Sequence, residues 1–413
     1  MGSVRGRIRK GQQVPTQLAV PLDDGTAMLA MIQELIPLGL MAVEETLSQE
    51  VRALAGGRYE RGERAPGVVR WGRQPGSIYL ADQKLPILVP RVRDRARGRE
   101  LSLTTYERLQ TPRALDVGLF RRVLGGLSSR EYAAAAEAVP QAFGLSKTSV
   151  SRRFIRASAR ALRQLTERRL DDAEWLVLML DGKSFADDQI VVALGVTRTG
   201  EKRLLGLVQT ATENKRVCAA FLRELQERGF RSPAGLLVVL DGSKGLRAAV
   251  REVFGDVPVQ RCQWHKRENV VSYLPKNEQP AWRRKLQAAY AQPSHADAQR
   301  ALQRLRRELA LRNASAARSL EEGLDETLTL HRLNVFPELG VSFKTTNLIE
   351  SVMARVEAKT ARVARWRTSD QKLRWCAAAL LAAEAHFRRV KGYKHLRLLE
   401  RALTTKMITT AAA

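Results

Sequence analysis

The chain has 413 residues, of which 44% are hydrophobic and 27% charged, as expected for a globular protein of about two to four domains. It carries 70 Lys and Arg against 43 Asp and Glu, and a formal net charge of +27 favours a polyanionic partner such as nucleic acid. Three scattered cysteines exclude a disulfide scaffold and fit a reducing cytosol. The basic N-terminus lacks the apolar core of a secretory signal, and no apolar run reaches about 18 residues, so we expect no membrane span.

Residues 1–25 are polar and are predicted to form a basic flexible arm. Helical spacing of apolar residues follows over residues 26–55. Pro37 and Gly39 lie inside this segment, and we expect them to break or kink the helix.

The next segment changes character. Residues 56–76 are rich in Gly and Arg and are predicted to form a loop, whereas residues 77–93 have the pattern of a β-hairpin. Pro86 and Pro90 lack an N–H group, which predicts an edge position for the second strand. We therefore expect an N-terminal helix and hairpin region over residues 26–110.

Residues 111–170 are predicted to form a helix-turn-helix DNA-binding domain. Ser128 or Ser129 can cap a short alanine-rich helix, and Ser146 can cap a second, basic helix after a glycine-containing turn. The alternative is a helical hairpin with solvated arginines. If the segment binds DNA, the candidate contacts on the second helix are Lys147, Ser149, Arg152, Arg153 and Arg156.

From residue 171 onward, the spacing of apolar residues is typical of β-strands. Three apolar segments form a predicted meander, followed by helix, strand, helix, strand and helix. This β-β-β-α-β-α-β-α order is that of the ribonuclease H fold, a mixed α/β sheet flanked by helices. We expect the first part of this core at 171–274, an all-helical insertion at 275–343, and the second part with basic C-terminal helices at 344–413. Within the insertion, residues 275–335 are predicted to form three helical stretches, with breaks at residues 292–294 and 312–313.

Two aspartates follow apolar strands of this order. Asp181 comes after WLVLML and Asp241 after LLVVL, each with a glycine behind it. If the strands are neighbours, both carboxylates lie at one sheet edge and suit a hard divalent cation. Glu350, near the start of a later helix, is the best third carboxylate, in competition with Glu321, Glu322 and Glu357. Two ions about 4 Å apart could then activate water and stabilise a leaving 3′ oxygen.

Positive charge is dense near the C-terminus. Residues 351–413 hold 14 Lys and Arg against 4 Asp and Glu, so we expect this stretch to line bound DNA. The candidate contacts there are Arg355, Lys359, Arg362, Arg365 and Arg367.

Several blocks of the sequence, VLDGSKGLRAAVREVFG, VQRCQWHKRENVVSYLP and FKTTNLIESVMARV, resemble the Mutator-type family of bacterial insertion-sequence transposases, the insertion sequence 256 group. The similarity extends over most of the chain. It implies a DDE triad on a ribonuclease H fold with a helical insertion, and motif matching assigns Asp181, Asp241 and Glu350 as catalytic and metal-binding residues. It also implies Mg²⁺ or Mn²⁺, terminal inverted repeats as substrate, and strand cleavage followed by strand transfer.

The family also carries a Cys-x-x-His element, matched by Cys262 and His265 as a supporting element of the active site. We do not expect zinc, because a second ligand pair is lacking nearby. His265, Lys266 and Arg267 are candidate DNA contacts. Trp264 is either a core residue, the favoured interpretation, or a stacking surface for an unpaired base. For Trp366 and Trp375 we also expect packing, with arginine stems over the rings.

The chain is therefore predicted to be a DDE transposase that binds double-stranded DNA, both terminal repeats and target, and acts at least as a homodimer on DNA. We expect no nucleotide cofactor, since the chain has no P-loop pattern, and no membrane partner. The expected location is the bacterial cytoplasm, at the nucleoid. Two alternatives remain: a DNA-binding regulator without enzymatic activity, and a nuclease on the same fold that cuts without joining.

Overall fold

The computed structural model describes residues 24–58, 67–80, 83–110, 115–127, 147–185, 188–210, 214–361, 363, 365–366 and 368–411. The chain divides into two compact units. One comprises residues 1–119 with 129–150, and the other comprises residues 120–128 with 151–413. In the part of the chain that the structure describes, no helix combines the length and apolar character needed to cross a bilayer.

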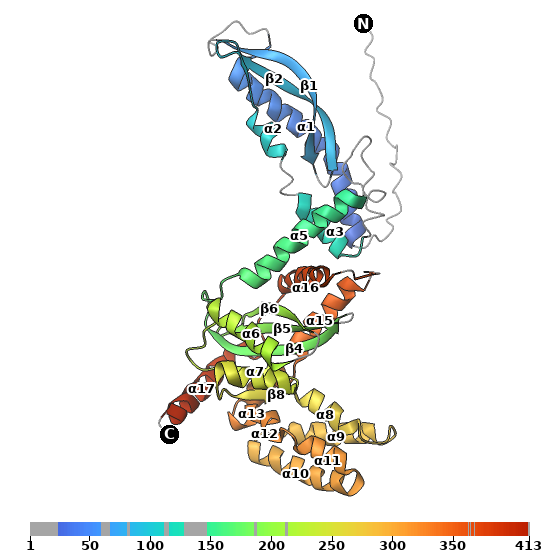
Figure 1. The fold of residues 1–413 in the computed structure, drawn as a ribbon, viewed down its shortest axis with the longest axis vertical. Helices are drawn as coiled ribbons and strands as arrows, with labels where there is room; N and C mark the ends of the chain where they lie inside the picture. Colours follow the sequence, from blue (N-terminus) through green and yellow to red (C-terminus); the bar gives the residue numbers. More distant parts are fainter. Residues whose placement is uncertain are drawn as a thin grey trace, which may run out of the picture. The chain divides into compact units, whose positions relative to one another are not determined.

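The first unit is a helix packed on a small sheet (Figure 1). Helix α1 (Asp24–Ala55) lies against the antiparallel strands β1 (Val68–Leu80) and β2 (Gln83–Asp94). A short third strand, β3 (Arg99–Leu101), pairs with the end of β2, and helix α2 (Thr104–Leu109) follows. Apolar residues at helical spacing on α1 join alternating strand residues in one core, which includes Val43, Leu47, Val51, Ile78, Leu85 and Val92.

The predicted hairpin is confirmed, but other expectations for this unit are wrong. Helix α1 is not broken at Pro37 and Gly39, because the packed C-terminal half stabilises the helix, and the alternative of a kink there stays a prediction. Strand β1 begins at Val68, inside the predicted loop 56–76. Strand β2 is the central strand, although β3 pairs only with Val92–Asp94, beyond the two prolines.

The predicted helix-turn-helix is described only in part. Helix α3 (Leu115–Leu124) precedes it, and helix α5 (Lys147–Glu167) confirms a long basic helix where the second helix is expected. The predicted first helix and the turn lie outside the described residues, so the motif stays a prediction. The ring of Phe154 on α5 lies 5.7 Å from Phe120 and 4.6 Å from Trp375, measured between ring centroids.

The second unit is built on a five-stranded mixed sheet (Figure 1). Strands β4 (Trp175–Phe185), β5 (Asp188–Thr197) and β6 (Lys202–Thr210) form the predicted antiparallel meander. Strands β7 (Leu237–Leu240) and β8 (Val259–Arg261) run parallel to β4, which gives the order β6-β5-β4-β7-β8. The central strands are buried along their apolar runs, which explains their continuous hydrophobicity.

Helices α6 (Lys215–Glu227) and α7 (Lys244–Phe254) cover one face of this sheet, and their apolar residues share a core with β4, β5 and β7. Asn214 and Ser243 cap the two helices by accepting hydrogen bonds from Val217 and Leu246 main-chain N–H groups. The predicted alternation of helices and strands from residue 171 to residue 271 is therefore confirmed.

A helical unit separates β8 from the last part of the core. It contains α8 (Gln263–Val271), α9 (Gln279–Tyr290), α10 (His295–Arg312), α11 (Ala314–Glu321), α12 (Leu324–Thr327), α13 (Thr329–Arg332) and α14 (Phe336–Phe343). The predicted breaks near Ser294 and Asn313 are confirmed, because both residues cap the helices that follow them. The three stretches predicted over 275–335 are five helices, since α12 and α13 are too short to show helical periodicity.

The chain returns to the sheet through α15 (Asn347–Thr360), which contacts β4, and α16 (Ser369–Glu384), which contacts β6. A short turn of 3₁₀ helix (Tyr393–His395) and α17 (Leu396–Ala411) complete the chain. The Trp366 ring lies 4.9 Å from Phe185 and 6.3 Å from Trp375, so both tryptophans pack against other rings as expected, and the arginine stems expected over them stay a prediction.

Hydrogen bonds tie both edge strands of the sheet to distant helices. On β6, the main-chain N–H of Leu204 donates to Glu384 of α16 over 2.6 Å, and Glu384 also accepts two hydrogen bonds from Arg168. On β8, the side-chain oxygen of Gln260 accepts from the main-chain N–H of Leu330 in α13 at 2.9 Å. Both edge strands are thereby tied to helices that follow much later in the sequence.

Candidate active site

The first two carboxylates lie on adjacent parallel strands. Strand β4 pairs with β7 from Val177↔Leu237 to Leu180↔Leu240, so Asp181 and Asp241 each come one residue after the last pair. The strands are neighbours, as predicted. Asp181 itself is still within β4, paired with Val192 of β5, and is only 6% exposed, because the antiparallel pairing continues after β7 has ended.

The turn after β7 fixes the position of Asp241. Its Oδ1 accepts a hydrogen bond from the main-chain N–H of Ser243 at 2.9 Å. Gly242 has a φ of +135°, and a Cβ there would come within 2.5 Å of the Arg261 guanidinium, so only glycine fits between the aspartate and the helix cap. The turn therefore holds one carboxylate oxygen and directs the residue toward the sheet edge.

Glu350 lies in the first turn of α15, as predicted. Four buried apolar residues hold this helix against the core: Ile349, Val352, Met353 and Val356. Thr346 precedes the helix, its carbonyl accepts from the Glu350 N–H at 3.0 Å, and its hydroxyl donates to Glu350 Oε1. An ion pair of 2.8 Å between Lys183 of β4 and Glu357 of α15 shows that this helix and the strand carrying Asp181 lie side by side.

The competing glutamates have other partners. Glu357 pairs with Lys183, and Glu322 lies in the helical unit within 4 Å of Arg261 and Lys266. Glu321 is near Arg306 at 3.3 Å. Glu350 differs from them because it contacts the Cys-x-x-His element, whose His265 lines the same cavity as Asp241.

Those contacts run through His265 and Cys262. Nδ1 of His265 is 3.8 Å from Glu350 Oε1 and 3.4 Å from the Thr346 hydroxyl, which is also 3.4 Å from Cys262 Sγ. A thiol, an imidazole nitrogen and a carboxylate oxygen of Cys262, His265 and Glu350 all lie within 4.8 Å of one another. They are one short of the four protein ligands of a structural zinc site.

The cluster is strongly polarised. Burial of the imidazole disfavours its charged form, but the hydrogen bond to Cys262 and the charges of Cys262, Glu350 and Asp241 outweigh it and raise the pKa of His265 to about 9. Burial opposes the thiolate, yet hydrogen bonds with His265 and Thr346 lower the pKa of Cys262. The structure therefore favours a positively charged imidazole between the thiol and the carboxylates.

Asp241 and His265 open into the same cavity. Its volume is about 490 Å³, and it is lined by Gly182, Gln189, Asp241, Gly242, Ser243, His265 and Asn269. The lining comes from β4, β5, the turn before α7 and helix α8, so this cavity is where the two strand ends meet the Cys-x-x-His element. Sequence reasoning missed Gln189 and Asn269, because neither belongs to a recognisable spacing.

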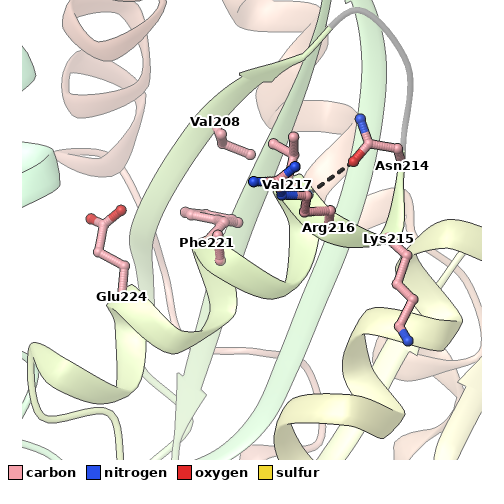
Figure 2. A pocket seen from close by; sticks show the side chains of 8 residues that line it. Val208, Asn214, Lys215, Arg216, Val217, Phe221 and Glu224 are labelled. Atoms are coloured by element: carbon pink, nitrogen blue, oxygen red, sulfur yellow. Dashed lines mark hydrogen bonds between the residues drawn. The ribbon is translucent and has the colours of Figure 1, made fainter.

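A larger cavity of about 870 Å³ lies beside α6 and is mostly apolar (Figure 2). Val208 and Phe221 contribute to its wall, and Asn214 caps the helix at one end. Among the residues that line it, Glu224 is the single carboxylate. The smaller cavity also has a single carboxylate in its lining, Asp241, but that residue lies beside His265 and follows the strand next to the one that carries Asp181.

The predicted DNA contacts differ in accessibility. On α5, Lys147, Arg152 and Arg156 are exposed and Ser149 half-buried, but Arg153 is only 7% exposed, contrary to its predicted role. Arg355 and Arg365 are exposed and Lys359 is half-buried. Arg362 and Arg367 lie outside the described residues.

The predictions for α8 need a larger correction. Lys266 is 1% exposed, and its ammonium donates to the carbonyls of Ser319 and Glu322 at 2.6 Å each, so it does not face DNA. Arg267 is occupied by Glu268 and Gln287. Trp264, expected in the core, is 42% exposed.

Comparison with known proteins places this geometry in a family. The model of the family described as "Transposase, Mutator family" matches residues 27–389. The transposase of insertion sequence element IS6120 from Mycolicibacterium smegmatis is 30% identical over 57% of this chain and 74% of its own length. The IS406 transposase of Burkholderia multivorans is 25% identical over 85% of this chain and 90% of its own length. The transposase of IS256 in transposon Tn4001 from Staphylococcus aureus is 26% identical over 70% of this chain and 75% of its own length.

Proposed function

Because the chain belongs to the Mutator family of transposases, we propose that it is a DDE transposase that binds the terminal inverted repeats of its insertion sequence and cleaves and joins DNA strands. The catalytic residues of this proposal are Asp181, Asp241 and Glu350. The observation that carries it is the register Leu180↔Leu240, which puts two aspartates side by side on parallel strands, with the helix of Glu350 against the same β4. The sheet order and the helical unit before α15 support a ribonuclease H-like core.

The donor set fits a hard divalent cation, since all three side chains offer carboxylate oxygens. Mg²⁺ or Mn²⁺, as one or two ions held by these residues, would supply the positive charge that activates water and stabilises a leaving 3′ oxygen. The rest of the site orients the ligands. The Ser243 N–H holds one oxygen of Asp241, and the Thr346 hydroxyl holds one oxygen of Glu350.

DNA binding in this proposal follows from the exposed basic side chains. Exposed Arg355 and half-buried Lys359 lie on α15 after Glu350, and in this proposal they contact phosphates of the DNA bound at the acidic site. The exposed cations of α5 would contact the repeat through the proposed helix-turn-helix. The chain would act as at least a dimer on DNA, in the bacterial cytoplasm at the nucleoid and without a nucleotide cofactor.

The test is a reaction of the full chain with labelled DNA carrying the terminal repeats of its own element, with Mg²⁺ or Mn²⁺. We expect cleaved and joined products from the wild type. Asp181→Asn, Asp241→Asn and Glu350→Gln should bind the repeats and form neither product. Glu357→Gln, on the same helix as Glu350, is the matched control and should stay active.

Other outcomes would select a different function. Binding without metal-dependent cleavage by the wild type would indicate a regulator. Cleavage without joining would indicate a nuclease on the same fold. Full activity of Glu350→Gln would show that another glutamate completes the site.

A further inference from the structure

The side chain of Trp264 is unusually exposed for a tryptophan on a helix whose neighbouring residues are buried. It is 42% exposed, whereas Cys262, Gln263 and Lys266 around it are at most 5% exposed. Large aromatic side chains usually contribute to a core, and an indole left in water sacrifices that stabilisation. Its exposure therefore calls for a physical reason.

The reason lies in the anchors of α8. The Gln263 side chain donates to the Thr327 carbonyl at 2.9 Å, and its main-chain N–H donates to the Lys344 carbonyl at 2.9 Å. Lys266, three residues later on the same helix face, is held by two further carbonyls. Because these polar anchors point inward, Trp264 is directed outward, and the helix cannot rotate to bury it without breaking them.

The indole lies beside the candidate active site. Its ring centroid is 4.8 Å from that of His265, with the two rings nearly perpendicular at 77°. His265 lines the 490 Å³ cavity together with Asp241. Trp264 is therefore a rigid aromatic surface next to the cavity in which, on the proposed function, a phosphodiester is cut.

Other exposed aromatic rings differ from it. The Arg93 guanidinium lies over the Trp71 ring at 4.8 Å, and the Arg389 guanidinium lies over Tyr393 at 5.3 Å. Tyr273 is more exposed than Trp264, at 52%, but lies past the far end of α8. Trp264 thus combines exposure, rigidity and proximity to the carboxylates.

We propose that Trp264 is a stacking surface for an unpaired DNA base next to the scissile phosphodiester. The inference rests on the proposed function. On the proposed function, a strand must separate from its complement to bring its phosphodiester to the cavity that Asp241 and His265 line, and stacking on an aromatic ring compensates for the lost base stacking. Stacking is tolerant of sequence, so Trp264 would recognise the opened end and not a particular base.

The experiment uses the full chain and a terminal-repeat duplex with 2-aminopurine at the base next to the cleavage position and a mismatch opposite it, so that this base is unpaired with every variant, first without divalent metal. A dye at the far end of the duplex reports binding by anisotropy. We expect the wild type to quench 2-aminopurine through the stacked indole, Trp264→Leu to leave it bright, and both to bind the duplex within threefold. Tyr273→Leu is the control and should quench like the wild type.

Cleavage in Mg²⁺ gives a second readout. Trp264→Leu should cut the paired duplex roughly 5- to 150-fold more slowly, the range expected for one base–aromatic stack, and a mismatch at the opened base should restore much of the rate. Trp264→Phe should retain most of the quenching and the rate. A core role would instead lower the unfolding temperature of Trp264→Leu without rescue by the mismatch.

The two proposals fail in different ways. If Trp264→Leu quenches and cuts like the wild type, the stacking inference is overturned while the transposase remains. If the wild type binds the repeat without cutting in any metal, the proposed function fails, and the 2-aminopurine signal alone decides on Trp264. If Trp264→Leu does not fold, Trp264→Phe and Trp264→His test the stacking inference instead. Trp264→Phe should quench 2-aminopurine, and Trp264→His should quench it less.

Discussion

Thr346 offers a sharp test of how the third carboxylate is held. Its hydroxyl is buried, donates to Glu350 Oε1 and lies 3.4 Å from Nδ1 of His265, so it bridges the imidazole and the carboxylate. Thr346→Val keeps the shape of the side chain and removes this bridge. Thr346→Ser keeps the hydroxyl and removes only a methyl group.

The size of the effect follows from the geometry. A hydrogen bond to a charged group contributes about 1.5–3 kcal/mol, but the Glu350 side chain is 32% exposed, and water can replace part of the interaction. We therefore expect a loss of about 1–2 kcal/mol, which corresponds to a roughly 5- to 30-fold lower cleavage rate. Thr346→Ser should remain within about threefold of the wild type.

The assay is single-turnover cleavage of the terminal-repeat duplex at saturating protein, repeated over a series of Mg²⁺ concentrations. Loss of orientation at Glu350 should raise the Mg²⁺ concentration needed for half-maximal rate, whereas general unfolding would lower the melting temperature without that shift. A Thr346→Val variant as fast as the wild type at every Mg²⁺ concentration would refute the reasoning. So would a Thr346→Ser variant as slow as Thr346→Val.

Lys266→Met leaves two buried carbonyls without a donor, and we expect calorimetry to show a melting temperature about 4–8 °C lower, with exposed Lys276→Met unchanged. Burial lowers the pKa of Lys266 to about 8 from 10.5 in the unfolded chain, so the stability advantage of the wild type over Lys266→Met should grow as pH rises from 8 to 10.5 and stay level below pH 8. Gly392→Ala would bring a Cβ within 2.6 Å of the Glu338 carbonyl at a φ of +78°, and should cost about 1–3 kcal/mol more in urea unfolding than Gly98→Ala, which has a φ of +65° and no atom within 4 Å of the added Cβ. Equal melting temperatures for Lys266→Met and Lys276→Met, or equal urea midpoints for the two alanine variants, would contradict these predictions.

The order of the second unit could be predicted because its elements carry their own signals. The buried strands are continuous apolar runs. The starts of four helices are marked by residues whose side chains cap them, namely Asn214, Ser243, Ser294 and Asn313. The neighbouring aspartates followed from the same order, since a helix between two parallel strands places their carboxyl ends at one edge.

The errors arose where distant residues decide the outcome. Residues 70–75 of β1 are exposed, so they show no alternation, and only pairing with β2 makes them a strand. Lys266 is buried and Trp264 exposed, the reverse of their hydropathy, because the carbonyls that hold Lys266 are supplied by α11, more than fifty residues later. A pattern of neighbouring residues in the sequence cannot indicate a partner that lies so far along the chain.

The edges of the five-stranded sheet also constrain the order of events during synthesis. The hydrogen bond of Leu204 on β6 cannot form until Glu384 has been synthesised, and that of Gln260 on β8 cannot form until Leu330 has been. A nascent chain therefore has exposed strand edges long after its strands have been made. Glu350 emerges from the ribosome in that same interval. A chain interrupted before α15 would hold both aspartates at the sheet but neither the third carboxylate nor the helix that covers the β6 edge, so such fragments should be inactive and prone to associate through that edge.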